Sequence, residues 1–261
     1  MIFLFPNDCF NPRQPDLAYE ERFLSFKQAG LRTALIEIES LDNPNSQVYP
    51  QLAAGDSVIY LGWMLSKQDY IHLSKIIHKQ AAGLWNGVTE YLHTHYLCNW
   101  YPYLQDLTPE TKFYPLDADL ETELKKLNWE RYFIKDYVKS LKTSVGSIID
   151  RPEEINTVLA EMKKYRGEIE GRICIRRVED FIVESERRYF VFNGKVFAPD
   201  ANEAIPDIVD RCIPRIKSNF YSVDVIERRD GVKRIVEVGD GQVSDLVNWS
   251  IERFIEIWKS I

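Results

Sequence analysis

The sequence predicts an α/β domain with a largely parallel sheet over residues 1–112, followed by an α+β domain with antiparallel sheets over residues 113–261. In the first part, short apolar runs alternate with amphipathic segments, which is the pattern of a parallel α/β layer. In the second part, an Asn-Gly and an Asp-Gly dipeptide separate strand-like segments, which indicates antiparallel hairpins. Residues 101–115 carry three prolines and form the predicted junction.

Strands and helices are expected to alternate in the first part. The predicted strands lie at residues 2–5, 34–38 and 58–61, and the predicted helices at residues 17–29 and from Ser66 to Gly83. Asp16 stands at the N-cap of the first helix and Gly30 directly past its end, and both residue types are typical of those positions.

The second part is expected to contain two strands, a capped helix, two hairpins and a closing helix after Ser244. The predicted strands lie at residues 132–138 and 145–149, and the hairpin strands at residues 188–192, 195–197, 221–228 and 232–238. Pro152 opens the capped helix, and Glu153 and Glu154 complement the helix dipole in its first turn. We expect this helix to cover a sheet.

Composition and charge exclude several classes of protein. Hydrophobic residues make up 45% of the chain and charged residues 28%, which is ordinary for a globular protein. The net charge of −7 opposes binding of duplex nucleic acid over the whole surface, although a local basic groove stays possible. The four cysteines form no CxxC pair, and the longest initial apolar run is far too short to cross a bilayer. We therefore expect a cytoplasmic protein without membrane partners, and the oligomeric state is not predicted.

The second hairpin brings two acidic residues together. If Asp230 and Gly231 form a two-residue loop, the numbers of opposed residues sum to 461, so Asp224 faces Glu237. Two carboxylates about 4 Å apart repel by about 4 kcal/mol at an effective dielectric constant of about 20. A divalent cation such as Mg²⁺ would relieve this repulsion. A nearby arginine or lysine, or a raised pKa of one carboxyl, remain the alternatives.

Two cationic residues could bind an anion near this pair. Lys135 lies within an apolar strand, where an unpaired charge is costly. Arg188 stands two residues after Glu186, and its guanidinium suits phosphate or carboxylate. The alternatives are that the Lys135 ammonium reaches solvent and that Arg188 pairs with Glu186.

The order of these features resembles the ATP-grasp superfamily, and in particular a diverged compact clade of ATP-grasp domain proteins. The resemblance is carried by the segments FIKDYVKS, RICIRRVEDF, ESERRYFVFNGKVF, FYSVDV and IVEVGDG, and it covers residues 113–261. Residues 1–112 look like the pre-ATP-grasp domain of that family. The resemblance implies an ATP-grasp fold in which two α+β lobes bind ATP between them.

The resemblance also implies a set of nucleotide contacts. Lys135 matches the family lysine that contacts the phosphates, and Lys142 lies in the segment that matches the flexible phosphate loop. Arg176 is expected to contact phosphate or substrate from the strand that leads to the adenine-binding hinge. Glu179 and Phe181 fall in the hinge itself.

The remaining implied site residues belong to the γ-phosphate and the metal. Glu186 and Arg188 belong to an ExRxF pattern, and Arg188 is expected near the γ-phosphate or the acceptor carboxylate. Asp224 and Glu237 match the two metal ligands of the family. Many members continue the last strand as Glu-x-Asn, which is missing here, so Asp240 is the candidate for a further ligand.

The implied activity is that of an ATP- and Mg²⁺-dependent carboxylate-amine ligase that forms an acylphosphate and releases ADP. Its partners would be small-molecule or peptide carboxylates and amines. Two alternatives stay open: a kinase or other phosphotransferase on the same fold, and a nucleotide-binding protein without turnover.

Overall fold

The computed structural model describes the chain except for residues 44, 139–145, 167–168, 170 and 260–261. The chain packs into two compact units, each assembled from separate segments. The first unit consists of Met1–Thr94, Arg187–Asp224 and Val238–Ile261, and the second unit of His95–Glu186 and Val225–Glu237. The predicted domain boundary at residues 112 and 113 remains a prediction, because these units describe packing rather than the extent of each domain.

A five-stranded sheet forms the centre of the first unit. Its strand order is β3-β2-β1-β4-β5, with β1 at Ile2–Pro6, β2 at Thr33–Ile36, β3 at Val48–Tyr49, β4 at Ser57–Tyr60 and β5 at Gly83–Leu84. All pairs are parallel except β2 with β3. The largely parallel sheet predicted from the sequence is confirmed.

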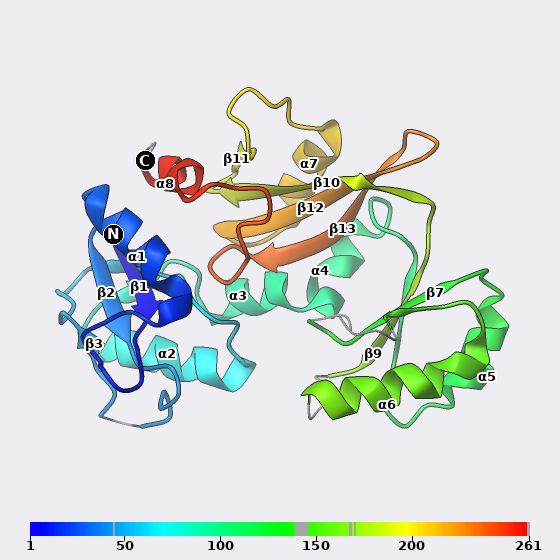
Figure 1. The fold of residues 1–261 in the computed structure, drawn as a ribbon, viewed down its shortest axis with the longest axis horizontal. Coiled ribbons are helices and arrows are strands. Elements are labelled where there is room, and N and C mark those ends of the chain that lie inside the picture. The colour runs from blue at the N-terminus through cyan, green and yellow to red at the C-terminus, as the bar shows by residue number, and fades with distance from the viewer. Residues whose placement is uncertain (44, 139–145, 167–168, 170, 260–261) are drawn as a thin grey trace. The chain divides into compact units, whose positions relative to one another are not determined.

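Helices cover both faces of this sheet. Side chains of β1 alternate: Ile2 and Leu4 pack in one core cluster with α2 (Lys67–Lys79), whereas Phe3 and Phe5 pack in a second cluster. The second cluster includes α1 (Glu20–Gln28) and α8 (Ile251–Lys259), which Figure 1 shows side by side. The alternation of a strand thus gives each face its own hydrophobic core. The unit also contains a 3-10 turn at Leu17–Tyr19, α7 (Asp207–Cys212) and a 3-10 turn at Ile213–Arg215.

The predicted helix signals are present. Asp16 accepts a hydrogen bond from the Ala18 amide at 2.8 Å at the start of the first helical segment. Gly30 follows the end of α1 with a φ of 78°, a conformation that glycine adopts without steric cost. Ser66 accepts a hydrogen bond from the Asp69 amide and caps α2.

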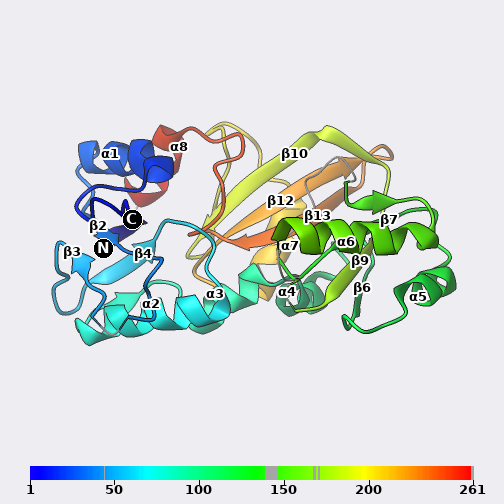
Figure 2. The same ribbon diagram turned by 60° about the horizontal axis from the view of Figure 1, so that its bottom comes forward.

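The second unit contains an antiparallel sheet with the order β6-β9-β7-β8. Its strands are β6 (Thr111–Tyr114), β7 (Tyr132–Lys135), β8 (Ile148–Ile149) and β9 (Ile173–Arg177). The helices are α4 (Leu97–Leu104), α5 (Leu120–Leu127), a 3-10 turn (Pro152–Glu154) and α6 (Ile155–Arg166), while α3 (Val88–His95) precedes them. Helix α6 covers the sheet, as predicted, because its buried residues share a core cluster with those of β7 and β9 (Figure 2).

Two expectations for this region differ from the structure. Strand β7 ends at Lys135, three residues earlier than predicted. Helix α4 lies inside the Pro-rich segment that was expected to be a junction, with Pro102 within the helix. Buried Trp100 and Leu104 anchor α4, so packing outweighs the local preference of proline for loops.

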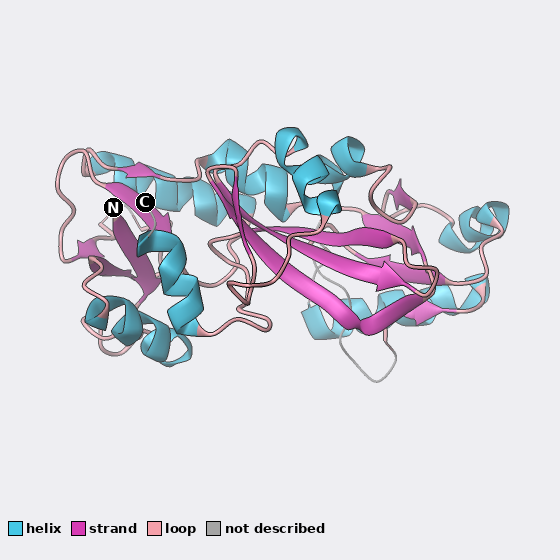
Figure 3. Cartoon of the chain, turned by 90° about the horizontal axis from the view of Figure 1, so that it is seen from above, coloured by secondary structure: helices cyan, strands magenta, loops and turns pink. Residues whose placement is uncertain are grey.

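A second antiparallel sheet has the order β11-β10-β12-β13. Its strands are β10 (Phe181–Phe192), β11 (Lys195–Phe197), β12 (Phe220–Arg228) and β13 (Lys233–Asp240), three of them long twisted ribbons in Figure 3. The division between the two units crosses β10 after Glu186, β12 after Asp224 and β13 after Glu237. The two predicted metal ligands are therefore each the last residue of a segment at this division.

The two hairpin turns differ. Asn193 and Gly194 both have positive φ, and Phe192 pairs with Lys195, so the predicted type I′ turn is confirmed. In the second hairpin the predicted two-residue loop is wrong. The Arg228 amide donates to the Val232 carbonyl at 2.9 Å, which makes the loop three residues long.

The second turn has a physical cause. Gly231 has a φ of 84°, whereas Asp230 is not among the described residues with positive φ, and its carboxylate accepts a hydrogen bond from the Val232 amide. This is the type I turn with a glycine bulge, the usual three-residue hairpin loop. Because Arg228 pairs with Val232, the register at the tip differs by one residue from the predicted register. The opposition of Asp224 and Glu237 therefore does not follow from the turn and stays a prediction.

No helix among the described residues is long and apolar enough to cross a membrane. The four cysteines are free, and Cys174 and Cys212 are buried.

Candidate functional site

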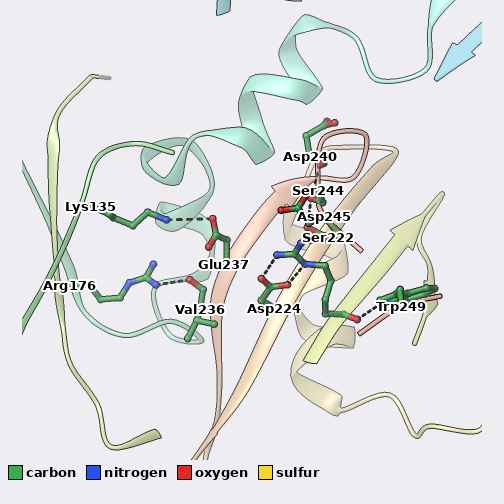
Figure 4. Close-up of polar contacts among 11 residues, drawn as sticks. Lys135, Arg176, Ser222, Asp224, Val236, Glu237, Asp240, Ser244, Asp245 and Trp249 are labelled. Atoms are coloured by element: carbon green, nitrogen blue, oxygen red, sulfur yellow. Dashed lines mark hydrogen bonds and ion pairs between the residues drawn. The ribbon is translucent and has the colours of Figure 1, made fainter. Parts of the chain in front are cut away.

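Lys135 is a buried lysine at the end of β7, with only 4% of its surface exposed. Its ammonium lies 3.5 Å from the Glu237 carboxylate, and the two residues belong to the same unit (Figure 4). The alternative in which the ammonium reaches solvent is therefore wrong.

Arg176 lies on the same face of the sheet as Lys135. Lys135 pairs with Cys174, and Arg176 is two residues further along β9, so the two cations are diagonal neighbours. Their strands bury Ile134 and Ile175 on the opposite face. The alternation of apolar and polar residues in the two strands thus gathers positive charge on one surface.

The Arg176 guanidinium is buried, with 6% of the residue exposed, and it is only partly satisfied. Its Nη1 donates to the Val236 carbonyl at 2.5 Å and its Nε to the Thr111 hydroxyl at 3.3 Å (Figure 4). The buried Nη2 has no hydrogen-bond partner within the part of the chain that the structure describes. Burial lowers the pKa of Arg176, and the Glu237 carboxylate partly offsets this effect. An anion at Nη2 would remove the unsatisfied donor.

In the first unit, Arg188 and Asp224 form a bidentate ion pair. Arg188 donates from Nε to one carboxylate oxygen at 2.7 Å and from Nη2 to the other at 2.6 Å (Figure 4). The side chains are 14% and 7% exposed. Two further contacts fix Arg188: its Nη1 donates to the Asp245 carbonyl, and its own carbonyl accepts from the Trp249 indole. This geometry is the strongest form of charge-assisted hydrogen bonding in proteins.

Both predicted metal ligands thus have a cationic partner in the structure, Asp224 with Arg188 and Glu237 with Lys135. This is one of the alternatives that the sequence left open for relieving repulsion between carboxylates. Glu237 has a side chain that is 46% exposed, so it can change partners at a small energetic cost.

Asp240 lies in the core of the first unit. It is completely buried, and its carboxylate accepts hydrogen bonds from the Asn86 side chain and from the backbone and side-chain nitrogens of Gln242. Burial raises its pKa to about 7, and these hydrogen bonds act in the opposite direction. Gln242 also donates to the Tyr70 hydroxyl and accepts from the Tyr60 amide. We therefore leave Asp240 out of the metal site that we propose below.

The other predicted site residues are distributed as follows. Glu179 accepts hydrogen bonds from Arg228 at 3.3 Å and Arg234 at 2.9 Å, next to the tip of the second hairpin. Phe181 begins β10 and is partly buried, and Glu186 is exposed on the same strand. Lys142 lies outside the described residues. The adenine-binding role of the hinge remains a prediction.

Among the described residues, no three His, Cys, Asp or Glu side chains are grouped so that they could hold a metal ion. Two carboxylates together with phosphate oxygens are a common ligand set for Mg²⁺, so the pair Asp224 and Glu237 needs no third protein ligand.

Sequence reasoning missed several residues that shape the site. Asn86, Gln242 and Asp245 contact site residues only through tertiary structure, and no local pattern marks them. Arg22 on α1 belongs to the same group and is discussed below.

Comparison with known proteins identifies the family. A family model of the ATP-grasp domain, the third family of its clade, matches residues 119–261, which is more than half of the chain. No curated protein matches the chain.

Solved structures of similar fold extend over the whole chain. The ATP-grasp ligase PsnB in complex with a minimal precursor is 10% identical with a TM-score of 0.63, over 99% of this chain and 98% of that chain. D-alanyl-alanine synthetase A from Vibrio cholerae O1 biovar eltor is 10% identical with a TM-score of 0.63, over 100% and 98%. D-cycloserine synthetase DcsG is 10% identical with a TM-score of 0.64, over 100% and 99%.

PsnB has also been solved with Mg and ADP. Identities this low support a shared fold, which agrees with the mixed α/β sheet and antiparallel sheets described above. Taken with the family match, these structures show that the chain belongs to the ATP-grasp family.

Proposed function

We propose that the protein is an ATP- and Mg²⁺-dependent ligase that joins a carboxylate to an amine through an acylphosphate and releases ADP. The observation that carries this proposal is the buried, unsatisfied Nη2 of Arg176 on the same sheet face as Lys135. Two buried cations with an open donor suit a polyphosphate. Family membership and the ligase activity named for the similar structures support the same conclusion.

Lys135 and Arg176 would bind the phosphates of ATP. Lys135 is charge-paired with one half-exposed carboxylate at 3.5 Å, a contact weak enough to be exchanged for phosphate oxygens. Arg176 already spends Nη1 and Nε on the protein, which fixes the direction of Nη2. Such pre-orientation lowers the cost of stabilising charge that develops during phosphoryl transfer.

Asp224 and Glu237 would hold Mg²⁺, which would neutralise phosphate charge when bound. Both are carboxylates, the hard ligands that Mg²⁺ prefers, and both end a segment of β12 or β13 at the division between the units. Each would give up a cationic partner on binding. Arg188 would then be available for the γ-phosphate or the acceptor carboxylate, as the family resemblance implies.

The reaction balances as follows. An oxygen of the substrate carboxylate attacks the γ-phosphorus, the bond to the β-phosphate oxygen breaks, and ADP leaves. The amine nitrogen then attacks the acyl carbon, the carbon–oxygen bond to phosphate breaks, and the amine proton passes to solvent. Lys135, Arg176 and Arg188 act by position and charge throughout, so no covalent protein nucleophile is required.

The substrates would be small molecules or peptides. PsnB and the macrocyclase MdnC were solved with precursor peptides, and D-cycloserine synthetase is named for a small product. This range of structural neighbours leaves both classes open to test.

The proposal is tested by incubating the protein with Mg²⁺, ATP and pooled carboxylates, amines and peptides. Mass spectrometry should find a condensed adduct whose amount follows ADP release, and Arg176→Gln should abolish both. Arg177→Gln is the matched control, because Arg177 is the next residue in β9 and is exposed. A phosphorylated product without an adduct would instead indicate a kinase, and nucleotide binding without any ADP would indicate a protein without turnover.

A further inference from the structure

Arg22 on α1 is a partly buried arginine whose hydrogen-bonding groups are not used by the protein. Among the described residues it donates no hydrogen bond and forms no ion pair. Its guanidinium carbon lies 5.7 Å from the centre of the Tyr19 ring and 5.9 Å from that of the Phe254 ring. The aromatic rings therefore hold the guanidinium while its donors remain open.

Burial makes this arrangement costly without an anion. Desolvation lowers the pKa of Arg22, and the carboxylate of Asp245 and Tyr19 partly offset the effect. A planar guanidinium with several free N–H groups is suited to bidentate binding of a carboxylate. The physical state of Arg22 thus points to an anionic ligand.

The position of Arg22 in the sheet favours a ligand site. In open α/β sheets, ligands bind outside the carboxyl ends of the strands where the strand order reverses. Here β1 lies between β2 and β4, so the chain switches sides at β1 and β4. Arg22 and Tyr19 follow β1, and Trp63 follows β4.

Trp63 provides apolar surface at the same place. Its residue surface is 46% exposed, although its indole nitrogen donates to the Asp16 carboxylate at 3.0 Å and its ring packs edge-on against Tyr19 at 5.1 Å. A large aromatic side chain that is fixed in place and still half-exposed is typical of a contact surface.

Two short routes connect Arg22 to Arg188 within the first unit. Asp245 acts electrostatically on Arg22 and accepts a hydrogen bond from Arg188 through its carbonyl at 2.8 Å. Phe254 lies next to Arg22 and packs against Trp249, whose indole donates to the Arg188 carbonyl at 2.9 Å. Arg22 is therefore close to the arginine that we place at the reacting carboxylate.

We propose that Arg22 binds a second, non-reacting carboxylate of a ligase substrate, while Trp63 contacts the apolar part of that substrate. The inference rests on the proposed function, because Arg188 is taken to serve the reacting group. Two sources supply this chemistry: an amino acid whose amine reacts and whose carboxylate does not, and a dicarboxylic acid that reacts at one end.

The test measures binding by isothermal titration calorimetry without nucleotide. The probes are phenylalanine and leucine, each as L and D isomers, and glutarate, each compared with its amide. At least one acid should bind, and its amide should bind about tenfold more weakly or worse, because a hydrogen bond to a charged group is lost. Which acid binds distinguishes the amino acid from the dicarboxylic acid.

Three variants complete the experiment. Arg22→Gln should weaken binding of the acid about tenfold and leave the amide unchanged, and Arg22→Lys should retain part of the affinity. Arg13→Gln is the matched control, because Arg13 also lies over an aromatic ring, that of Tyr49 at 5.1 Å. Its affinity should equal that of the unaltered protein, and thermal melting should confirm that all three variants fold.

The outcomes separate the inference from the proposed function. Equal binding of acid and amide, no binding of any acid, or full affinity in Arg22→Gln would overturn the inference. Loss of acid binding in Arg22→Gln supports it even if no ADP is ever released, a result that would count against the ligase alone.

Discussion

Arg188 donates two hydrogen bonds to Asp224, at 2.7 and 2.6 Å, so that a proposed phosphate ligand and a proposed metal ligand neutralise each other in the absence of both. This pair explains how the first unit keeps two charged groups nearly buried. It also implies that binding of Mg²⁺ and ATP exchanges partners rather than filling a prearranged set of free groups.

Removal of one member of this pair should destabilise the protein. Asp224→Asn leaves the Arg188 charge buried without a counter-charge, and the free energy of unfolding should fall by about 3 kcal/mol. Urea denaturation measures the change. Asp245→Asn is the control and should have little effect, because Arg188 contacts the backbone carbonyl of Asp245. Equal stability of Asp224→Asn and the unaltered protein would show that the ion pair is not formed in solution.

Glu237→Gln should behave differently, because its side chain is half-exposed and its contact with Lys135 is long. Folding stability should change by about 1 kcal/mol or less, whereas Mg²⁺-dependent ADP release should be abolished. Glu227→Gln is matched to it, since Glu227 pairs with Lys233 in the same hairpin, and should keep full activity. ADP release by Glu237→Gln at the rate of the unaltered protein would remove Glu237 from the metal site.

Arg176→Gln should weaken ATP binding about tenfold or more, because the open Nη2 is lost. Equilibrium binding of a fluorescent ATP analogue measures this, with Arg177→Gln as the control. Unchanged affinity in Arg176→Gln would mean that Nη2 does not face the nucleotide.

Stability should depend on the protonation of Asp240. Its pKa is about 7 in the folded protein and 3.8 in the ordinary carboxyl, so the folded state binds the proton more tightly. The contribution of the protonated group is fully present below pH 4 and is lost as pH rises toward 7, with a slope of at most about 1.4 kcal/mol per pH unit. Unfolding measured between pH 5 and 7 should show this slope in the unaltered protein and not in Asp240→Asn. A slope of equal size in both proteins would contradict the assignment.

The sequence was informative wherever local chemistry decides the structure. Asp16, Ser66 and the Asn193-Gly194 turn have local functions, and the structure confirms each of them. The second hairpin shows the limit of local reasoning. An Asp-Gly dipeptide fits both a two-residue turn and a three-residue loop with a glycine bulge, and the Asp230 side chain selects the latter.

Tertiary contacts were beyond this reasoning. Lys135 was expected to meet an anion because a charge in an apolar strand needs a partner, and its contact with Glu237 confirms this. The partner of Arg188 comes from a strand 36 residues away, and Arg22 looks like any solvated helix residue in the sequence. Only the packing of α1 against α8 reveals that Arg22 is partly buried with open donors.

Transfer of oxygen from substrate to phosphate tests the central claim most directly. The substrate carboxylate is labelled with ¹⁸O, and the inorganic phosphate released with ADP is analysed by mass spectrometry. An acylphosphate requires one labelled oxygen in each phosphate, which is the result we predict. Phosphate without label, or label retained entirely in the condensed product, would contradict the proposed reaction.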